Sequence, residues 1–430
     1  MKRILLFSTA LLLCISSFAT GYGKTLRLDY IFSGTDRMAE ISLAKMRSLD
    51  GWYGRSVNMD SLLLRGNGRI RMNDKETGRL LYINSFSTLF QEWQNEEEAT
   101  RVRKSFENVF LVPMPAAPAV VTVEQTDNYS QVVASLTHEV DPSDILIAPV
   151  KSDYPYRYLL KSGPCEECID VAFVAEGYTA EEAELFFSEA EMAMESILSH
   201  EPFKSMKDRF NFVAVAAPSD ESGISVPHEH DWKNTVLGFH FDTFYSERYL
   251  TTLNLFKLHD VLASVPYEHI VILANTDTYG GGGIYNSYMV SSMRHAQSRP
   301  VIVHEFGHSF AGLGDEYFYD DEFVQTYNNV VEPWEPNITT LVDFGSKWKD
   351  MMETDGPVTK EEQAAKAGKR IDFSTADFKV GLYEGAGYMS RGAYRPYPEC
   401  RMKINEYPRF CPVCERAIQR MIDFNTVEVE

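Results

Sequence analysis

The segment Pro300–Glu316 constrains the fold of this chain most, because it combines a helix start, two histidines and a helix stop. Apolar residues at helical spacing predict an α-helix that has Pro300 in its first turn and packs against a larger core. His304 and His308 are four residues apart, so a helix places both imidazoles on one face. Gly312 is expected to end the helix, since glycine readily adopts the left-handed backbone found at helix C-termini.

The spacing H-E-x-x-H within this helix is typical of a catalytic zinc site. Two imidazoles on one face can hold a single Zn²⁺, while Glu305 is turned partly away and can reach a water bound to the metal. Zinc lowers the pKa of that water to about 7, and a carboxylate can take its proton as the water attacks a carbonyl carbon. We therefore predict one catalytic Zn²⁺ with His304 and His308 as ligands and Glu305 as the catalytic base.

A third protein ligand is expected just beyond the helix. In the metzincin pattern a glycine three residues after the second histidine turns the chain, and a histidine or aspartate three residues further on completes the site. Here Gly312 and Asp315 each lie one position later than the pattern requires. Asp315 is the first candidate, because the glycine turn brings it back toward the metal. Glu316 and a more distant glutamate on a later helix are the alternatives.

Length and charge restrict the class of protein. A chain of 430 residues predicts two domains, and a hydrophobic content of 44% suffices for large cores. The formal net charge is −21, from 41 basic and 62 acidic residues. Nucleic acid is therefore not an expected partner, because phosphate binding requires a cationic surface.

The N-terminus predicts export. A short basic start, an apolar run over residues 4–13 and small residues at Ser17 and Ala19 indicate a signal peptide of residues 1–19. Cys14 resembles a lipoprotein site only weakly, because a small residue is expected directly before it. The apolar run is short for a membrane span, and no later segment is long enough. We expect a periplasmic, cell-surface or secreted protein without a transmembrane segment.

Cysteine usage leaves two interpretations. Removal of the signal peptide leaves two C-x-x-C pairs and one further cysteine, namely Cys165, Cys168, Cys400, Cys411 and Cys414. Paired C-x-x-C motifs are also found in structural zinc sites. In an oxidising compartment disulfides are favoured, either within Cys165/Cys168 or from Cys400 to one of the C-terminal pair.

Residues 24–150 predict an all-β sandwich. Alternating segments over residues 25–32, 79–86 and 119–125 are separated by turn-forming dipeptides, and no long helical period interrupts them. No catalytic constellation is evident in this region. Its expected role is a folding or spacing module, or the binding of a cell-surface glycan or host glycoprotein.

Residues 151–430 predict an α/β catalytic domain. Apolar strands are expected at 168–175, 210–216 and 268–275, with a helix at 180–200 capped by Thr179. The glycine run 280–283 lacks the lysine of a phosphate loop. It predicts either a strand edge along which a peptide is added, or a flexible hairpin turn.

Other candidate site residues lie outside the histidine helix. His228 and His230 would share one face of a strand and could bind a metal, although a solvated loop beside the cleft is the simpler interpretation. Met402, with Met389 as the alternative, is the candidate for the methionine turn beneath a metzincin metal. Tyr394 is the candidate donor to the oxyanion, and Tyr388 is its alternative.

Several stretches of the chain resemble the M64 family of bacterial metallopeptidases, the IgA-peptidase family. The matching stretches are residues 170–178, 221–224, 303–310, 312–317, 394–396, 400–402 and 410–414. The resemblance covers the chain from about residue 150 to its end, and residues before it resemble the β-sandwich that accompanies this domain. It implies a zinc endopeptidase with His304 and His308 as ligands and Glu305 as base. Cleavage of immunoglobulin A is not carried over, because no antibody-binding module is recognised.

The sequence thus predicts two domains, an all-β sandwich followed by an α/β, metzincin-like zincin domain. The expected function is zinc-dependent hydrolysis of peptide bonds in protein or peptide substrates. Two alternatives stay open: a surface protein that binds glycans or proteins through a decayed peptidase domain, and a peptidoglycan amidase. The intact Glu305 argues against decay.

Overall fold

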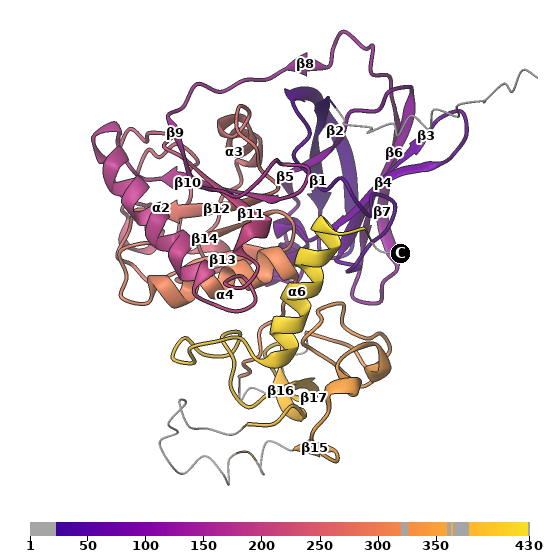
Figure 1. Ribbon diagram of the computed structural model, residues 1–430, viewed down its shortest axis with the longest axis vertical. Coiled ribbons are helices and arrows are strands. Elements are labelled where there is room, and N and C mark those ends of the chain that lie inside the picture. Colours follow the sequence, from indigo (N-terminus) through magenta and orange to yellow (C-terminus); the bar gives the residue numbers. More distant parts are fainter. Residues whose placement is uncertain (1–22, 320–325, 359–362, 364–377, 429–430) are drawn as a thin grey trace, which may run out of the picture.

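The computed structural model describes residues 23–319, 326–358, 363 and 378–428. The expected signal peptide, its cleavage site and Cys14 lie outside the described residues. Figure 1 shows two sheet-rich parts side by side, with the C-terminal helix running between them. Within the described residues, no helix is long and apolar enough to cross a membrane.

The N-terminal part consists of two four-stranded sheets that share one apolar core. The first sheet has the order β5-β1-β2-β8 and the second β4-β3-β6-β7. Their strands are β1 (Lys24–Gly34), β2 (Ala39–Asp50), β3 (Gly68–Asp74), β4 (Leu80–Phe86), β5 (Lys104–Pro113), β6 (Ala119–Thr126), β7 (Val132–Val140) and β8 (Ala148–Pro149). A short helix, α1 (Leu89–Trp93), follows β4. Strands therefore occupy all three segments in which the sequence predicted them.

The residues buried in these strands differ according to whether one face or both faces of the strand are covered. Strands β5 and β6 alternate between buried and partly exposed residues, as expected when one face of a sheet lies on a core. Strand β1 is buried over nearly its whole length. Its charged residue Arg27 is fully buried, and the guanidinium contacts Asp29 and, across to the second part, Asp260, each at 2.6 Å. The N-terminal part is thus docked firmly against the C-terminal part.

A six-stranded sheet of order β13-β14-β12-β10-β11-β9 forms the centre of the C-terminal part. Its strands are β9 (Tyr156–Lys161), β10 (Ile169–Glu176), β11 (Phe210–Val215), β12 (His269–Ala274), β13 (Gly281–Ile284) and β14 (Tyr288–Ser292). The four inner strands run parallel, and the two edge strands β9 and β13 are antiparallel to their neighbours. Every residue of β10 is buried, as the continuous apolar run predicted.

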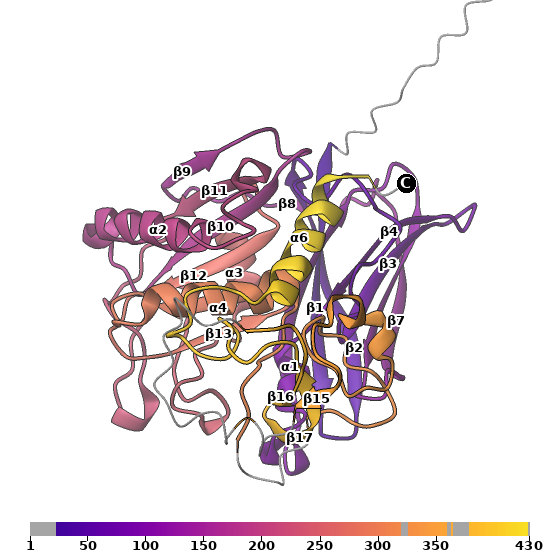
Figure 2. The same ribbon diagram turned by 60° about the horizontal axis from the view of Figure 1, so that its bottom comes forward.

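Helices cover this sheet and continue beyond it. They are α2 (Ala183–Leu198), α3 (Leu255–Val261), α4 (Ser298–Ala311) and α6 (Pro412–Thr426). The predicted cap precedes α2: the Glu182 carboxylate accepts a hydrogen bond from the Thr179 N–H at 2.9 Å, and a 3-10 turn (Ala180–Glu182) leads into the helix. A small third sheet of order β15-β16-β17 contains β15 (Pro357–Val358), β16 (Leu382–Ala386) and β17 (Met389–Arg395). Both views place α6 beside the sandwich (Figures 1 and 2).

The remaining 3-10 helices are short. They are η1 (Glu97–Thr100), η3 (Lys207–Arg209), η4 (Pro227–Glu229), η5 (Thr243–Tyr245), η6 (Phe344–Ser346) and η7 (Lys349–Met351). Most lie in the connections between the strands and helices of the C-terminal part.

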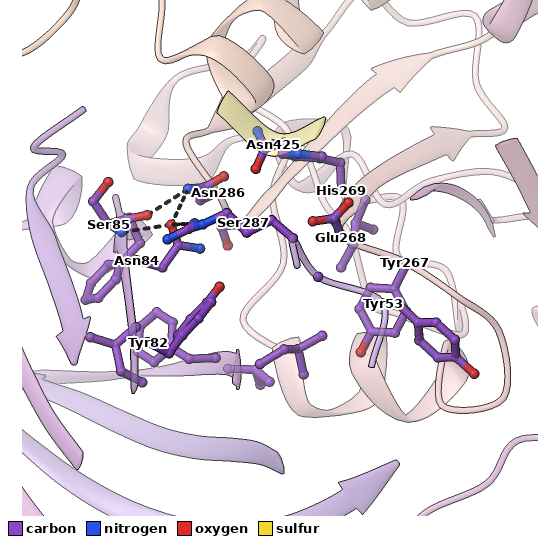
Figure 3. A pocket seen from close by; sticks show the side chains of 18 of the residues that line it. Tyr53, Tyr82, Asn84, Ser85, Tyr267, Glu268, His269, Asn286, Ser287 and Asn425 are labelled. Carbon is purple, nitrogen blue, oxygen red and sulfur yellow. Dashed lines mark hydrogen bonds between the residues drawn. The ribbon is translucent and has the colours of Figure 1, made fainter. Parts of the chain in front are cut away.

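A cavity of about 90 Å³ lies between the two parts. Figure 3 shows Tyr82 from the sandwich on one side of it and Glu268 and His269 from the C-terminal part on the other. Burial raises the pKa of Glu268 well above its usual value and lowers that of His269 to about 4, so the cavity disfavours charge. Of the residues that line it, only Tyr285 also lines the large cleft described next.

Candidate metal centre

Helix α4 carries the two histidines of the H-E-x-x-H segment on one face. Their Nε2 atoms lie 3.0 Å apart. The Asp315 Oδ1 atom lies 3.1 Å from His304 Nε2 and 3.3 Å from His308 Nε2. Helix, turn and loop therefore bring three potential ligand atoms to one point, and the same three residues form one of two such groups among the described residues.

The outer nitrogen of each ring is fixed by a backbone carbonyl. His304 Nδ1 lies 3.0 Å from the Arg401 carbonyl oxygen, and His308 Nδ1 contacts that of Leu313. A carbonyl can only accept, so each Nδ1 donates to its carbonyl and each Nε2 is turned toward Asp315. This second contact is the usual way in which metal-binding histidines are oriented.

The distances between these atoms fit a tetrahedral metal. Bonds of about 2.0–2.1 Å to nitrogen or oxygen imply tetrahedral edges of roughly 3.3–3.4 Å. The three observed separations lie between 3.0 and 3.3 Å. Asp315 Oδ1 is buried and lacks a hydrogen-bond donor. A divalent cation between the three atoms would satisfy all of them at once, so these residues fit the implied Zn²⁺.

The pKa shifts of the site residues also indicate a place that favours positive charge. Burial would raise the pKa of Asp315, but the two histidines hold that pKa well below its usual range. Burial would lower the pKa of His308, but the Asp315 carboxylate raises it to about 9. Burial raises the pKa of Glu305, while the histidines act in the opposite direction. The site therefore stabilises positive charge between His308 and Asp315.

The turn after α4 delivers Asp315 to the histidines. Gly312 has the left-handed conformation with φ of 60°, and its N–H and that of Leu313 donate to the last carbonyls of the helix. Asn337 then holds Gly314 by two hydrogen bonds, of 2.7 and 2.9 Å. The Tyr388 hydroxyl donates to the second oxygen of Asp315.

The glycine run forms the edge strand β13, which packs directly on α4. A Cβ at Gly281 would lie 2.9 Å from the Glu305 carboxylate, and one at Gly283 would lie 2.6 Å from the Glu305 carbonyl oxygen. Close approach of strand and helix thus accounts for these glycines. It also places Glu305 beside the edge of the sheet.

The two methionine candidates occupy different places. Met402 is fully buried, and a Cβ added at Gly307 of α4 would lie 2.8 Å from its sulfur, so Met402 lies directly against the histidine helix. Its carbonyl accepts from the Glu316 N–H at 2.8 Å. The Met389 sulfur instead accepts from the Tyr327 N–H at 3.3 Å.

The structure does not bring Tyr394 to the histidines. Tyr394 lies on β17 in a bridge with Thr339, and it is absent from the residues that line the cleft around the histidine pair. The alternative, Tyr388, does line that cleft. The two tyrosines are separated by the turn and strand that follow Tyr388, which sequence spacing alone does not orient.

The histidine pair lines a cleft of about 1100 Å³ between the two parts. The N-terminal part supplies part of its wall, through Arg65, Gly66, Asn67, Ser87, Glu92, Asn95, Glu96, Thr126, Asp127, Asn128 and Ser130. Glu92 accepts a hydrogen bond from the Tyr249 hydroxyl, and burial raises its pKa to about 7. Sequence reasoning missed this wall, because no local pattern reports how two parts dock.

The second histidine cluster remains apart from this centre. His228 Nδ1 contacts the Asp242 carboxylate at 2.9 Å. Neither His228 nor His230 lines the cleft, and neither belongs to a metal-binding group among the described residues.

The predicted disulfides are not present in the structure. All five described cysteines are free thiols. Cys400 and Cys414 are the nearest to the expected bridge, but their sulfur atoms lie 3.8 Å apart, far beyond a disulfide bond of about 2.05 Å. Both instead belong to a buried group with Cys411 and Glu316.

Two models of known protein families match the chain. The model described as IgA Peptidase M64 matches residues 158–374 and 359–422, and that described as Peptidase M64 N-terminus matches residues 18–137. No curated protein matches the chain. Members of this family are metallopeptidases that act on protein substrates. Since the match extends over more than half of its length, the chain belongs to the IgA Peptidase M64 family.

Proposed function

We propose that this protein is an exported zinc endopeptidase whose C-terminal part is a metzincin-like zincin domain. The observation that carries the proposal is the convergence of His304 Nε2, His308 Nε2 and Asp315 Oδ1 within 3.3 Å, directly beside Glu305. Family membership supports the peptidase activity. The signal-like N-terminus supports export.

The residues take separate roles in hydrolysis. His304, His308 and Asp315 would hold the Zn²⁺, which when bound supplies a Lewis acid for the scissile carbonyl and lowers the pKa of water. Glu305 accepts a proton from the attacking water and passes it to the leaving amine. Tyr388 fixes the orientation of Asp315 through its hydroxyl.

The edge of β13 supports binding of an extended peptide. The carbonyl of Gly281 already accepts from the Leu250 N–H at 3.5 Å on the outer side of this strand. Along a strand, the backbone N–H and C=O groups of successive residues point to opposite edges. Gly283 is two residues after Gly281, so its backbone groups face the same outer edge of β13. A substrate strand added there would run beside Glu305, with the cleft wall of the N-terminal part opposite.

The test compares the mature protein with its Glu305→Gln variant on a mixed peptide library, with metal content measured for both. We expect the wild type to cleave peptides, a chelator to stop it, and Glu305→Gln to keep its metal but lose about 10²–10⁴-fold in turnover, since only the base is removed. Undiminished turnover in Glu305→Gln would sink the mechanism.

The same experiment separates the rivals. Stoichiometric metal without peptide cleavage would redirect the assay to peptidoglycan, where release of amide-linked stem peptides identifies an amidase. Absence of bound metal would favour a binding protein, to be tested by probing a glycan and glycoprotein array with the full chain.

A further inference from the structure

A second group of metal-ligand side chains lies behind the histidine site. It consists of Glu316, Cys400, Cys411 and Cys414, all of them buried. One ligand atom from each lies within 4.8 Å of the others. We propose that these four residues bind a structural Zn²⁺ or a similar thiophilic divalent cation, separate from the ion of the histidine site.

The spacing of the four atoms fits one tetrahedral ion. The sulfurs of Cys400 and Cys414 are 3.8 Å apart, and Glu316 Oε1 lies 3.1 Å from Cys414 Sγ and 4.0 Å from Cys411 Sγ. Zinc bonds of about 2.3 Å to sulfur and 2.1 Å to oxygen imply edges of roughly 3.8 Å between sulfurs and 3.6 Å between sulfur and oxygen. The observed separations scatter around these values.

The buried carboxylate is an independent indication of a cation. Glu316 is fully buried, and its Oε2 atom has no hydrogen-bond partner. Its Oε1 atom accepts from Asn337 at 3.0 Å. The Arg395 guanidinium acts on this carboxylate electrostatically but forms no ion pair with it, and donates instead to the carbonyls of Glu384 and Gly385. A carboxylate in this position is costly unless a cation compensates it.

A disulfide would satisfy only two of the four side chains in this group. Three thiols share the site, so a bridge between any two of them leaves the third thiol and the carboxylate buried together. A metal employs all four groups. Cys411 is the N-cap of α6 and Cys414 lies in its first turn, which Pro412 starts. The Cys411 N–H donates to the Cys400 sulfur at 3.2 Å. Such backbone contacts stabilise a thiolate ligand.

The proposed ion would support the histidine site from behind. Glu316 follows Asp315 directly, and Cys400 immediately precedes Arg401 and Met402. The Arg401 carbonyl orients His304, and Met402 packs against α4. One ion would therefore tie the Asp315 turn, the Met402 turn and the start of α6 together.

The first test measures metal in the mature wild type after export and purification without reductant. We expect two zinc equivalents per chain, and X-ray absorption should show both sulfur neighbours at about 2.3 Å and nitrogen or oxygen neighbours. Replacement by Co²⁺ should give a sulfur-to-cobalt charge-transfer band. Thiol alkylation after metal removal, under denaturing and non-reducing conditions, should modify Cys400, Cys411 and Cys414.

Variants assign each equivalent. Cys411→Ser with Cys414→Ser should lose one equivalent and the charge-transfer band, and His304→Ala with His308→Ala should lose the other equivalent and keep the band. Cys165→Ser with Cys168→Ser is the matched control and should keep both.

A single equivalent without sulfur neighbours, or a disulfide between two of the three cysteines, would overturn the proposal. These wild-type readouts decide it even if the cysteine variants fail to fold. Glu305→Gln should retain both equivalents. Lack of peptidase activity would therefore refute the proposed function without touching this one.

Discussion

The contact between strand β13 and helix α4 leads to a prediction about the substitution Gly283→Ala. This residue has no positive φ, so alanine meets no backbone strain and the effect isolates space alone. Its new methyl group would lie 2.6 Å from the Glu305 carbonyl oxygen and 3.0 Å from His308 Cβ. Both atoms belong to the main body of α4, so neither can move without the helix.

The expected loss of stability and turnover follows from how far these two distances fall below an ordinary contact. Ordinary contact begins at 3.4 Å, so α4 must shift by about 0.8 Å relative to the strand. Overpacking of this kind costs about 1–3 kcal/mol of stability. A displacement near 1 Å of a catalytic group can lower turnover by about 10²-fold. We expect kcat to fall by about two orders of magnitude in a protein that still folds.

The assay measures kcat on a peptide selected from the library, together with urea denaturation and zinc content. Gly282→Ala is the control, because its methyl group would meet the Tyr249 ring at 2.9 Å and the Leu250 carbonyl, not α4. It should lower stability with a much smaller effect on kcat. Wild-type kcat in Gly283→Ala would refute the argument that this contact sets the position of Glu305.

Two further predictions concern stability and metal affinity. Arg27→Ala should lower the free energy of unfolding by about 3–5 kcal/mol in urea denaturation, because it leaves the Asp29 carboxylate buried with only Arg47, at 3.8 Å, beside it. Arg27→Met combined with Asp29→Leu should recover most of that loss, and equal losses in both proteins would contradict the reasoning. Asn337→Ala should weaken zinc binding at the histidine site by about 10–100-fold in competition with a chromophoric chelator, since it frees the Gly314 turn. Unchanged affinity would show that the turn is held without Asn337.

Local sequence signals located the helix of the candidate site and much of the fold. The H-E-x-x-H helix was expected to have Pro300 in its first turn and to end at Gly312; it runs from Ser298 to Ala311, with Pro300 in the first turn and Gly312 as its C-cap. The apolar run that became β10 and the capping box before α2 were likewise evident. Each of these depends on residues within a few positions of one another, where backbone propensity and capping decide the outcome.

Features that depend on distant parts of the chain were not evident. The cleft wall formed around Glu92 arises only when the two parts dock, and no nearby residue signals it. The spacing of Tyr388 and Tyr394 gave both as oxyanion candidates, but the turn between them directs only Tyr388 into the cleft. The cysteines were expected to pair, whereas the fold places three of them around Glu316.

The order Asp315-Glu316 also explains which of the two acids joins the histidines, a choice that sequence spacing left open. Helix α4 extends through Ala311, so the glycine turn falls at Gly312 and the acidic pair one position later than in the metzincin pattern. Residues 312–317 belong to no helix or strand, so the side chains of Asp315 and Glu316 are not held on one helical face. Asp315 therefore faces the histidines and Glu316 faces the cysteines. If both groups bind metal, one extra residue in the helix lets a single dipeptide supply a ligand to each ion, and the displaced spacing is then what allows two metal sites.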